Sequence, residues 1–193
     1  MEENYWLTYT KMKQKLMQKE IELKENIVAK LDGKMLAIKG TKGEIKKKFN
    51  NPTIKIAIQN NKIILSADNA TKRDKTMMGT FSAHIRNMMR GVLEGFVYRL
   101  KICSGHFPMN VSVENQNVLI KNFLGERVPR KAKVLPGAKV SIQGDIITVE
   151  GIDKEMVSQS ASNIELACRI SNRDRRVFMD GVWLITKDGK NIK

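Results

Sequence analysis

Few side chains in this sequence could perform acid–base, nucleophilic or metal chemistry. The imidazoles are His84 and His106, and the two cysteines, Cys103 and Cys168, stand far apart in the chain. Cys103-Ser-Gly-His106 has the spacing of half a zinc site, but a structural zinc needs two further ligands and no second cluster of this spacing follows. His84 lies beside the apolar stripe of an expected helix, where a hydrogen-bonded structural histidine is favoured over a catalytic one. We therefore expect no metal site and two reduced, packed thiols.

Short catalytic motifs are also absent from the sequence. It contains no Gly-x-Ser-x-Gly, no His-Glu-x-x-His and no Gly-x-x-x-x-Gly-Lys-Ser/Thr run. The run Gly40-Thr-Lys-Gly43 resembles a phosphate cradle, but a turn between two strands explains it better. We expect no enzymatic activity, no cofactor and no small-molecule substrate. A small hydrolase remains an alternative, but it ranks behind the two functions given below.

The net charge is the stronger indication of function. In 193 residues, 35 Lys and Arg stand against 20 Asp and Glu, a formal charge of +15. Such an excess repels itself unless a polyanion neutralises it, and nucleic acid, an anionic membrane surface or an acidic protein could do so. No apolar run approaches the ~20 residues of a spanning helix, and the first residues lack the pattern of a secretory signal. We expect a soluble intracellular protein with no membrane partner.

The basic residues form separate clusters on an expected strand, on a loop, after a helix and near the C-terminus. Each cluster alone is typical of a solvated face, and cations also complement a helix C-terminus. Together they favour nucleic acid. Aromatic residues are only 6% of the chain, which fits phosphate and shape recognition of folded RNA better than base stacking. The candidate RNA-binding residues are Lys46, Lys47, Lys48, Lys121, Arg127, Arg130, Lys131, Lys133, Arg169, Arg173, Arg175, Arg176, Lys187 and Lys190.

Hydrophobic periodicity predicts the elements that must position these clusters in the first half. Apolar residues at period two predict a hairpin over 27–38, turning at Asp32-Gly33, and strands over 45–49, 54–58 and 62–67. The period then changes to that of a helix between Thr71 and Leu93, and period two returns over 96–100. The expected buried stripe of this helix is Met78, Phe81, Ile85, Met88 and Val92.

The second half repeats this order. We expect a hairpin over 111–120, a basic turn-rich loop ending at Pro136-Gly137, and strands over 138–142 and 146–150. Asp153 is a plausible N-cap for a helix over 154–170, and a closing segment follows over 177–185. The face expected to be buried on this helix contains Met156, Ser160, Asn163, Ile164 and Ala167.

This repetition predicts an α+β fold made by tandem duplication of two small units, each an antiparallel-rich sheet packed against one helix. We expect an N-terminal extension over 1–20, a first unit over 21–103, and a second unit with a short basic tail over 104–193. The stretch 101–140 forms the seam between the units.

Several long runs of this sequence resemble the universal large-subunit ribosomal protein L-six family. They are GHFPMNV at 105–111, IKNFLGERVPRKAKVLPG at 120–137, TFSAHIRNMMRGVLEGFVYRL at 80–100 and GIDKEMVSQSASNIELACRISNRDRRVFMDGVW at 151–183. The nearest likeness is to the archaeal and eukaryotic branch, named L-nine in the eukaryotic cytosolic nomenclature. The resemblance extends over about residues 21–188.

The resemblance implies a structural constituent of the large ribosomal subunit in the cytoplasm. Such a protein binds and braces rRNA near the translation-factor-binding region, close to the sarcin-ricin loop. Its implied partners are large-subunit rRNA and neighbouring large-subunit proteins, including those of the stalk base. The alternative is a free RNA-binding or annealing module that acts off the ribosome.

Carried over by position, the resemblance favours contacts from two runs of the second half. In the first half KGEIKKKF matches the basic strand of the family, although Thr41 stands where a proline is common. The residues matched in the second half are Lys121, Arg127, Arg130, Lys131, Lys133, Arg173, Arg175 and Arg176.

Net charge and arginine placement favour different halves of the chain. Residues 1–103 hold 21 Lys and Arg against 10 Asp and Glu, whereas residues 104–193 hold 14 against 10. The second half nevertheless concentrates its arginines in two short segments. Because the planar guanidinium can hold phosphate oxygens bidentately, we expect the second unit to carry RNA binding.

Overall fold

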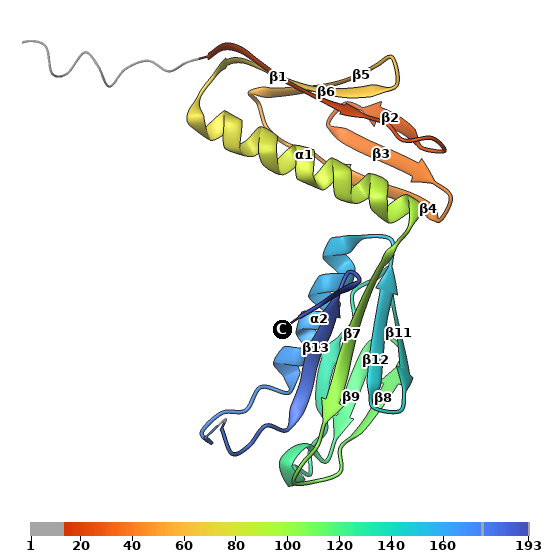
Figure 1. Ribbon diagram of the computed structural model, residues 1–193, viewed down its shortest axis with the longest axis vertical. Coiled ribbons are helices and arrows are strands. Elements are labelled where there is room, and N and C mark those ends of the chain that lie inside the picture. The colour runs from red at the N-terminus through yellow and green to blue at the C-terminus, as the bar shows by residue number, and fades with distance from the viewer. Residues whose placement is uncertain (1–13, 175, 193) are drawn as a thin grey trace, which may run out of the picture. The chain divides into compact units, whose positions relative to one another are not determined.

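The computed structural model describes residues 14–174 and 176–192, and it divides the chain into two compact units. Unit 1 is Met1–Leu93 and unit 2 is Glu94–Lys193 (Figure 1). Both units combine antiparallel sheets with one long helix.

Unit 1 contains two three-stranded antiparallel sheets and a helix. The strand orders are β1-β6-β5 and β2-β3-β4. Helix α1 covers the face of the first sheet that carries Ile63 and Leu65, which are fully buried. The elements are β1 (Gln14–Glu22), β2 (Val28–Asp32), β3 (Met35–Gly40), β4 (Gly43–Lys48), β5 (Ile54–Gln59), β6 (Lys62–Ala70) and α1 (Lys72–Leu93).

Unit 2 repeats this arrangement and adds a hairpin at its end. Its strand orders are β11-β12-β7-β13-β14 and β10-β9-β8. The elements are β7 (Phe96–Cys103), β8 (Asn110–Glu114), β9 (Asn117–Lys121), the 3-10 helix η1 (Phe123–Gly125), β10 (Arg130–Lys133), β11 (Ala138–Gln143), β12 (Ile146–Gly151), α2 (Lys154–Ala167), β13 (Gly181–Lys187) and β14 (Lys190–Asn191).

The matching strand orders confirm the predicted α+β fold and its duplication. The sheet β5-β6-β1 corresponds to β11-β12-β7, and the sheet β2-β3-β4 corresponds to β8-β9-β10. Each unit therefore holds two sheets where the sequence predicted one. In unit 2 the smaller sheet and α2 together cover one face of the larger sheet, since Val118 and Ile120 of β9 share a core with Val157 and Ile164 of α2.

The boundary between the units differs from the predicted one. It falls at Leu93 rather than 103, because β7 pairs with both β12 and β13 and is the central strand of unit 2. The predicted extension over 1–20 is wrong for residues 14–20, which belong to β1 and pair with β6. In the repeat, β1 takes the place that β7 takes in unit 2. Residues 1–13 lie outside the described residues.

The predicted stripe of α1 is confirmed, because Met78, Phe81, Ile85, Met88 and Val92 are all buried. On α2 the prediction is partly wrong. Ser160 and Ile164 are buried as expected. The other two buried residues are Val157, which takes the place expected for Met156, and Ala161, which follows Ser160. Asp153 is the N-cap, as predicted, and its side chain accepts from the Glu155 N–H at 2.9 Å.

The predicted basic loop contains a strand. Residues 130–133 pair with residues 117–120 as β10, with Ala132 buried between two exposed lysines. The alternating burial explains the spacing of Lys131 and Lys133, which share the outer face of β10. Within the described residues, no helix is long and apolar enough to cross a membrane.

Candidate nucleic-acid interface

Three segments meet at one end of unit 2, where β7 ends and β13 begins (Figure 1). They are residues 104–109, 122–129 and 168–180, and we call this region the loop end. Several predicted RNA-binding residues lie in or beside these segments. The contacts among the three segments decide which cations are free to meet a ligand.

Arg130 joins the middle segment to the end of α2. Its Nε and Nη2 atoms donate to the Glu126 carboxylate at 2.8 and 2.6 Å, and Nη1 donates to the backbone oxygens of Ala167 and Arg169 at 2.9 and 3.0 Å. The guanidinium also lies 4.2 Å from the centre of the Phe123 ring. The last carbonyls of a helix lack partners within the helix. Arg130 therefore supports the fold, and its fork is already occupied.

The electrostatics of this pair agree with its geometry. The hydrogen bond from Arg130 lowers the pKa of Glu126, and the charge of Arg173 lowers it further. The pKa of Arg130 is raised by its hydrogen bond to Glu126, so this guanidinium stays charged.

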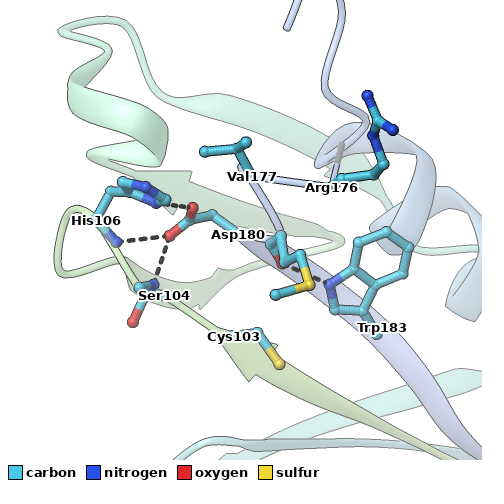
Figure 2. A pocket seen from close by; sticks show the side chains of 9 residues that line it. Cys103, Ser104, His106, Arg176, Val177, Asp180 and Trp183 are labelled. Atoms are coloured by element: carbon cyan, nitrogen blue, oxygen red, sulfur yellow. Dashed lines mark hydrogen bonds and ion pairs between the residues drawn. The ribbon is translucent and has the colours of Figure 1, made fainter. Parts of the chain in front are cut away.

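Asp180 fixes the first segment to the third. Its buried carboxylate accepts hydrogen bonds from the backbone N–H of Gly105 at 2.5 Å and of His106 at 2.9 Å (Figure 2). The other oxygen lies 2.5 Å from His106 Nδ1. Burial would raise the pKa of Asp180, but the hydrogen bonds from His106 and Gly105 outweigh it and lower the pKa. Because an ionised carboxylate can only accept, Nδ1–H donates.

This geometry gives the Cys-x-x-His run a structural role. His106 is held by Asp180, and Cys103 ends β7 with its side chain half-buried. Within 14–174 and 176–192, no group of three or more His, Cys, Asp or Glu residues could hold a metal. His84 Nδ1 lies 3.1 Å from Lys47 Nζ, so the expected hydrogen-bonded role of this histidine is confirmed.

The third segment presents its arginines to solvent. The Arg173 guanidinium lies 4.9 Å from the centre of the Phe178 ring, and this ring stacks on His106 at 4.7 Å. The Arg176 side chain is 90% exposed and pairs with Asp174 at 2.9 Å. An exposed ion pair of this kind contributes little to stability, so a phosphate can replace the carboxylate at small cost. Arg175 lies outside the described residues.

The remaining predicted residues of unit 2 fall into two places. Arg127 and Lys121 are exposed at the loop end, and Lys131 and Lys133 continue from it along the edge strand β10. Arg169 is exposed and follows α2. Lys187 and Lys190 face each other across the β13–β14 hairpin at the opposite end of β13, so they do not join the loop end.

The lysine triplet of unit 1 divides between two faces of β4. Lys46 and Lys48 are exposed, and Lys46 pairs with Glu44 at 3.3 Å. Lys47 points to the other face and contacts His84 of α1. The triplet is therefore not a single basic patch.

Sequence reasoning missed a second basic surface in unit 2, on the face of the five-stranded sheet that α2 does not cover. Arg99 and Lys101 alternate along β7 with the buried Tyr98 and Leu100, and both are exposed. Lys101 stands opposite Trp183 of β13. The signal was present in the sequence, since the same period of two that predicts the buried half of β7 also places the cations on the opposite face.

The same face ends in an open hollow within the loop end (Figure 2). Its cavity volume is about 860 Å³, and its lining includes Cys103, His106, Val177, Met179 and Trp183. Trp183 Nε1 donates to the backbone oxygen of Met179 at 3.1 Å. No pattern in the sequence indicates this hollow, because its walls come from segments about seventy residues apart.

The comparisons with known proteins agree with this architecture. The family profile described as Ribosomal protein L6 matches residues 24–95 and 107–181, once in each repeat. The chain is 45% identical over 172 residues to the large ribosomal subunit protein uL6 of Methanobrevibacter smithii, covering 89% of this chain and 97% of that protein. It is 40% identical over 169 residues to uL6 of Aeropyrum pernix, covering 87% and 93%. It is 43% identical over 170 residues to uL6 of Methanocella arvoryzae, covering 88% and 96%.

The chain therefore belongs to the ribosomal protein L6 family, the L-six family that its sequence resembled. This is a family of ribosomal proteins and not of enzymes, as the sequence predicted. The match in each repeat also agrees with the duplication seen in the strand orders.

Proposed function

We propose that this protein is a structural constituent of the large ribosomal subunit and braces rRNA through phosphate contacts near the translation-factor-binding region. Its place is the cytoplasmic ribosome, and its partners are large-subunit rRNA and adjoining proteins of the stalk base. Family membership supports the assignment to the large subunit, because the relatives carry that name and match nearly the whole chain. The position near the factor-binding region rests on the family resemblance.

The observation that carries rRNA binding is the set of exposed cations at the loop end. Arg127, Arg173 and Arg176 are exposed there, and Asp180 and Arg130 hold the segments that bear them. Preorganised arginines lose less freedom on binding and can meet phosphate oxygens with two parallel hydrogen bonds. Lys121, Lys131 and Lys133 extend this surface along the edge of the smaller sheet. We call these six residues the loop-end cations.

Salt dependence tests the phosphate mechanism. Affinity for isolated large-subunit rRNA should fall linearly with salt on logarithmic axes, with a slope of roughly −0.7 to −0.9 per phosphate engaged. Replacing Arg127 by Gln should lower the slope by about one phosphate contact, whereas replacing the occupied Arg130 by Gln should lower it less. A flat salt response would overturn the phosphate mechanism.

Sedimentation separates the ribosomal role from its alternative. A constituent of the large subunit should stay with large subunits through a high-salt wash and appear at about one copy per subunit. A free RNA-binding or annealing module would leave the particles in the wash and bind rRNA and unrelated structured RNA equally.

A further inference from the structure

The hollow within the loop end is not explained by core packing. Val177 is 60% exposed, Met179 66% and Trp183 37%, although all three are large and apolar. They lie together around one cavity rather than singly over the surface. Clustered exposed apolar side chains of this kind mark a surface that a ligand covers.

Two aromatic side chains of the hollow are held by hydrogen bonds to neighbouring residues. The Trp183 indole is held by its hydrogen bond to the backbone oxygen of Met179. Opposite Trp183, the His106 imidazole is held by Asp180 (Figure 2). The two aromatic rings are thus preformed on either side of the buried carboxylate.

Cations flank the apolar hollow on two sides. Arg176 contributes to its lining, and Lys101 stands directly across from Trp183 on the same face of the sheet. Arg99 continues this basic row along β7. The nearby acidic groups are already engaged, since Asp180 is hydrogen-bonded to His106 and Asp174 is paired with Arg176. The combination suits a flat, apolar group that is attached to negative charge.

We propose that this hollow receives an unpaired nucleobase of the bound RNA, which stacks on Trp183 while Lys101 and Arg176 contact the phosphates on either side. The inference rests on the proposed function and adds a base contact to it. A volume of about 860 Å³ holds a base with its ribose, within the size of ordinary ligand pockets. Every base offers a π-face, so stacking fixes the RNA without requiring one sequence.

Tryptophan fluorescence reports this contact directly. The chain has two tryptophans, so Trp6→Phe leaves Trp183 as the single emitter. Isolated large-subunit rRNA should quench Trp183 in this background, and it should also slow alkylation of Cys103, which lines the same hollow. Cys168 is buried, and burial raises its pKa to about 11, so it does not compete for the reagent.

Matched variants separate the hollow from the general charge of the protein. Val177→Glu should weaken rRNA binding at least about fivefold, the lower end for loss of one stacked base. Val28→Glu is the control, because Val28 is 56% exposed and lies in unit 1. It introduces the same charge and should weaken binding less than twofold. Trp183→Phe keeps an aromatic ring and should retain most of the affinity that Trp183→Ala loses.

The outcomes distinguish this inference from the proposed function. Salt-dependent rRNA binding without quenching, with equal effects of Val177→Glu and Val28→Glu, would overturn the base pocket and leave the phosphate mechanism standing. Quenching by large subunits but not by isolated rRNA would assign the hollow to a neighbouring protein and would also overturn the pocket. Absence of any rRNA binding by the folded parent protein would overturn the proposed function itself.

Discussion

The two repeats share their strand order but treat the helix-free face of the larger sheet differently. In unit 1 the basic side chains of this face are paired with acidic ones. Lys62 pairs with Glu20 and Glu22 at 3.2 Å, and Lys55 pairs with Asp68 at 3.0 Å. In unit 2 the equivalent face carries Arg99, Lys101 and Lys139, with Glu150 opposite Lys139, and within the part of the chain that the structure describes these four residues form no ion pair. The face in unit 1 therefore pairs its charges, whereas the equivalent face in unit 2 leaves cations available to an anion.

The kind of cation differs between the units as well. Residues 1–93 hold 19 Lys and Arg against 9 Asp and Glu, and residues 94–193 hold 16 against 11. Net charge therefore favours unit 1, yet seven of the ten arginines are in unit 2. Total charge and arginine content are therefore distributed differently between two copies of one fold, and the two kinds of cation are not interchangeable in binding phosphate.

The largest loss of stability should come from deleting β1, the strand of unit 1 that corresponds to β7 of unit 2. Deleting residues 1–22 removes β1 and the buried Ile21, so β6 loses the partner that corresponds to β7. Unit 1 should then lose its cooperative fold, since the loss is comparable to a domain's whole margin of roughly 5–15 kcal/mol. Amide hydrogen exchange should show α1 unprotected and α2 unchanged.

The matched control for this deletion removes residues 1–13 alone and retains every described strand. Protection of α1 should persist in this control. Protection that also persists after deletion of residues 1–22 would show that β1 is an accessory strand and not the counterpart of β7.

Two glycines test how tightly each unit packs its helix. A Cβ at Gly40 would lie 2.7 Å from the Val92 side chain and 2.9 Å from its backbone oxygen, at the C-terminal end of α1. A Cβ at Gly151 would lie 2.6 Å from the Val157 side chain and 2.7 Å from the Gly137 oxygen, near the start of α2. Gly40→Ala and Gly151→Ala should each cost roughly 1–3 kcal/mol, confined to their own units.

The control for these substitutions is Gly79→Ala. Gly79 is exposed on α1 and has nothing within 4 Å of an added Cβ, so alanine should stabilise unit 1 by up to about 1 kcal/mol. Denaturant unfolding followed separately in each unit gives these values. Equal behaviour of Gly79→Ala and Gly40→Ala would contradict the close packing.

A comparison of Arg130 with Arg127 tests whether an arginine with structural contacts behaves differently from an exposed arginine three residues away. Arg130→Lys keeps the charge but loses the fork that joins Glu126 to the end of α2, and it should cost about 1–2 kcal/mol. Arg127→Lys should change unfolding free energy by less than about 0.5 kcal/mol, because Arg127 is exposed. The rRNA affinities should respond in the opposite order.

Thermal unfolding and rRNA titration of the same two variants measure this contrast. If Arg130→Lys leaves stability intact and lowers rRNA affinity more than Arg127→Lys, Arg130 is a ligand residue after all and its structural role fails.

The smallest effect concerns the caps of the two helices. At the start of α1, Thr71 Oγ1 and N–H donate to the Asp74 carboxylate at 2.6 and 2.9 Å, whereas α2 has Asp153 as a simple N-cap. Thr71→Ala should cost about 1 kcal/mol. Hydrogen bonds from Thr53 and then from Thr71 lower the pKa of Asp74 from 3.8 to about 2.

A carboxyl group whose pKa is lower in the folded than in the unfolded protein stabilises the fold at pH values above its unfolded pKa. This stabilisation is lost as the pH falls through the folded pKa. The Asp74 contribution should therefore be complete above pH 4 and disappear between pH 4 and pH 2. Asp74→Asn should flatten the stability of unit 1 across this window in acid titrations. An unchanged acid profile would show that Asp74 is not the titrating cap.

The sequence predicts the strongly periodic elements of this fold well and the edges poorly. The α1 stripe and the 27–38 hairpin follow from apolar spacing alone. Strand β1 escaped prediction because Leu16 is exposed and Lys19 stands opposite the buried Leu65, so its residues show no clear alternation. The long-range pairing with β6 creates this strand, and sequence periodicity cannot report it.

The site divides in the same way. Residue type singled out Arg127, Arg173 and Arg176 as candidates, and the structure places all three on the surface. Residue type could not tell that Arg130 is occupied, because its carbonyl partners lie 37 and 39 residues further along the chain. The hollow at Trp183 was likewise beyond sequence reasoning, since its walls meet only after β7 and β13 pair.

The most direct measurement of the central claim compares matched charge reversals in the two units. Arg173→Glu with Arg176→Glu, both exposed at the loop end, is set against Lys46→Glu with Lys48→Glu, both exposed on β4. Each pair changes the net charge by the same amount, and circular dichroism establishes that each variant is folded. The arginine pair should weaken large-subunit rRNA binding on the order of tenfold or more, and clearly more than the lysine pair. An equal loss, or a larger loss from the lysine pair, would contradict the account and show that bulk charge governs attachment.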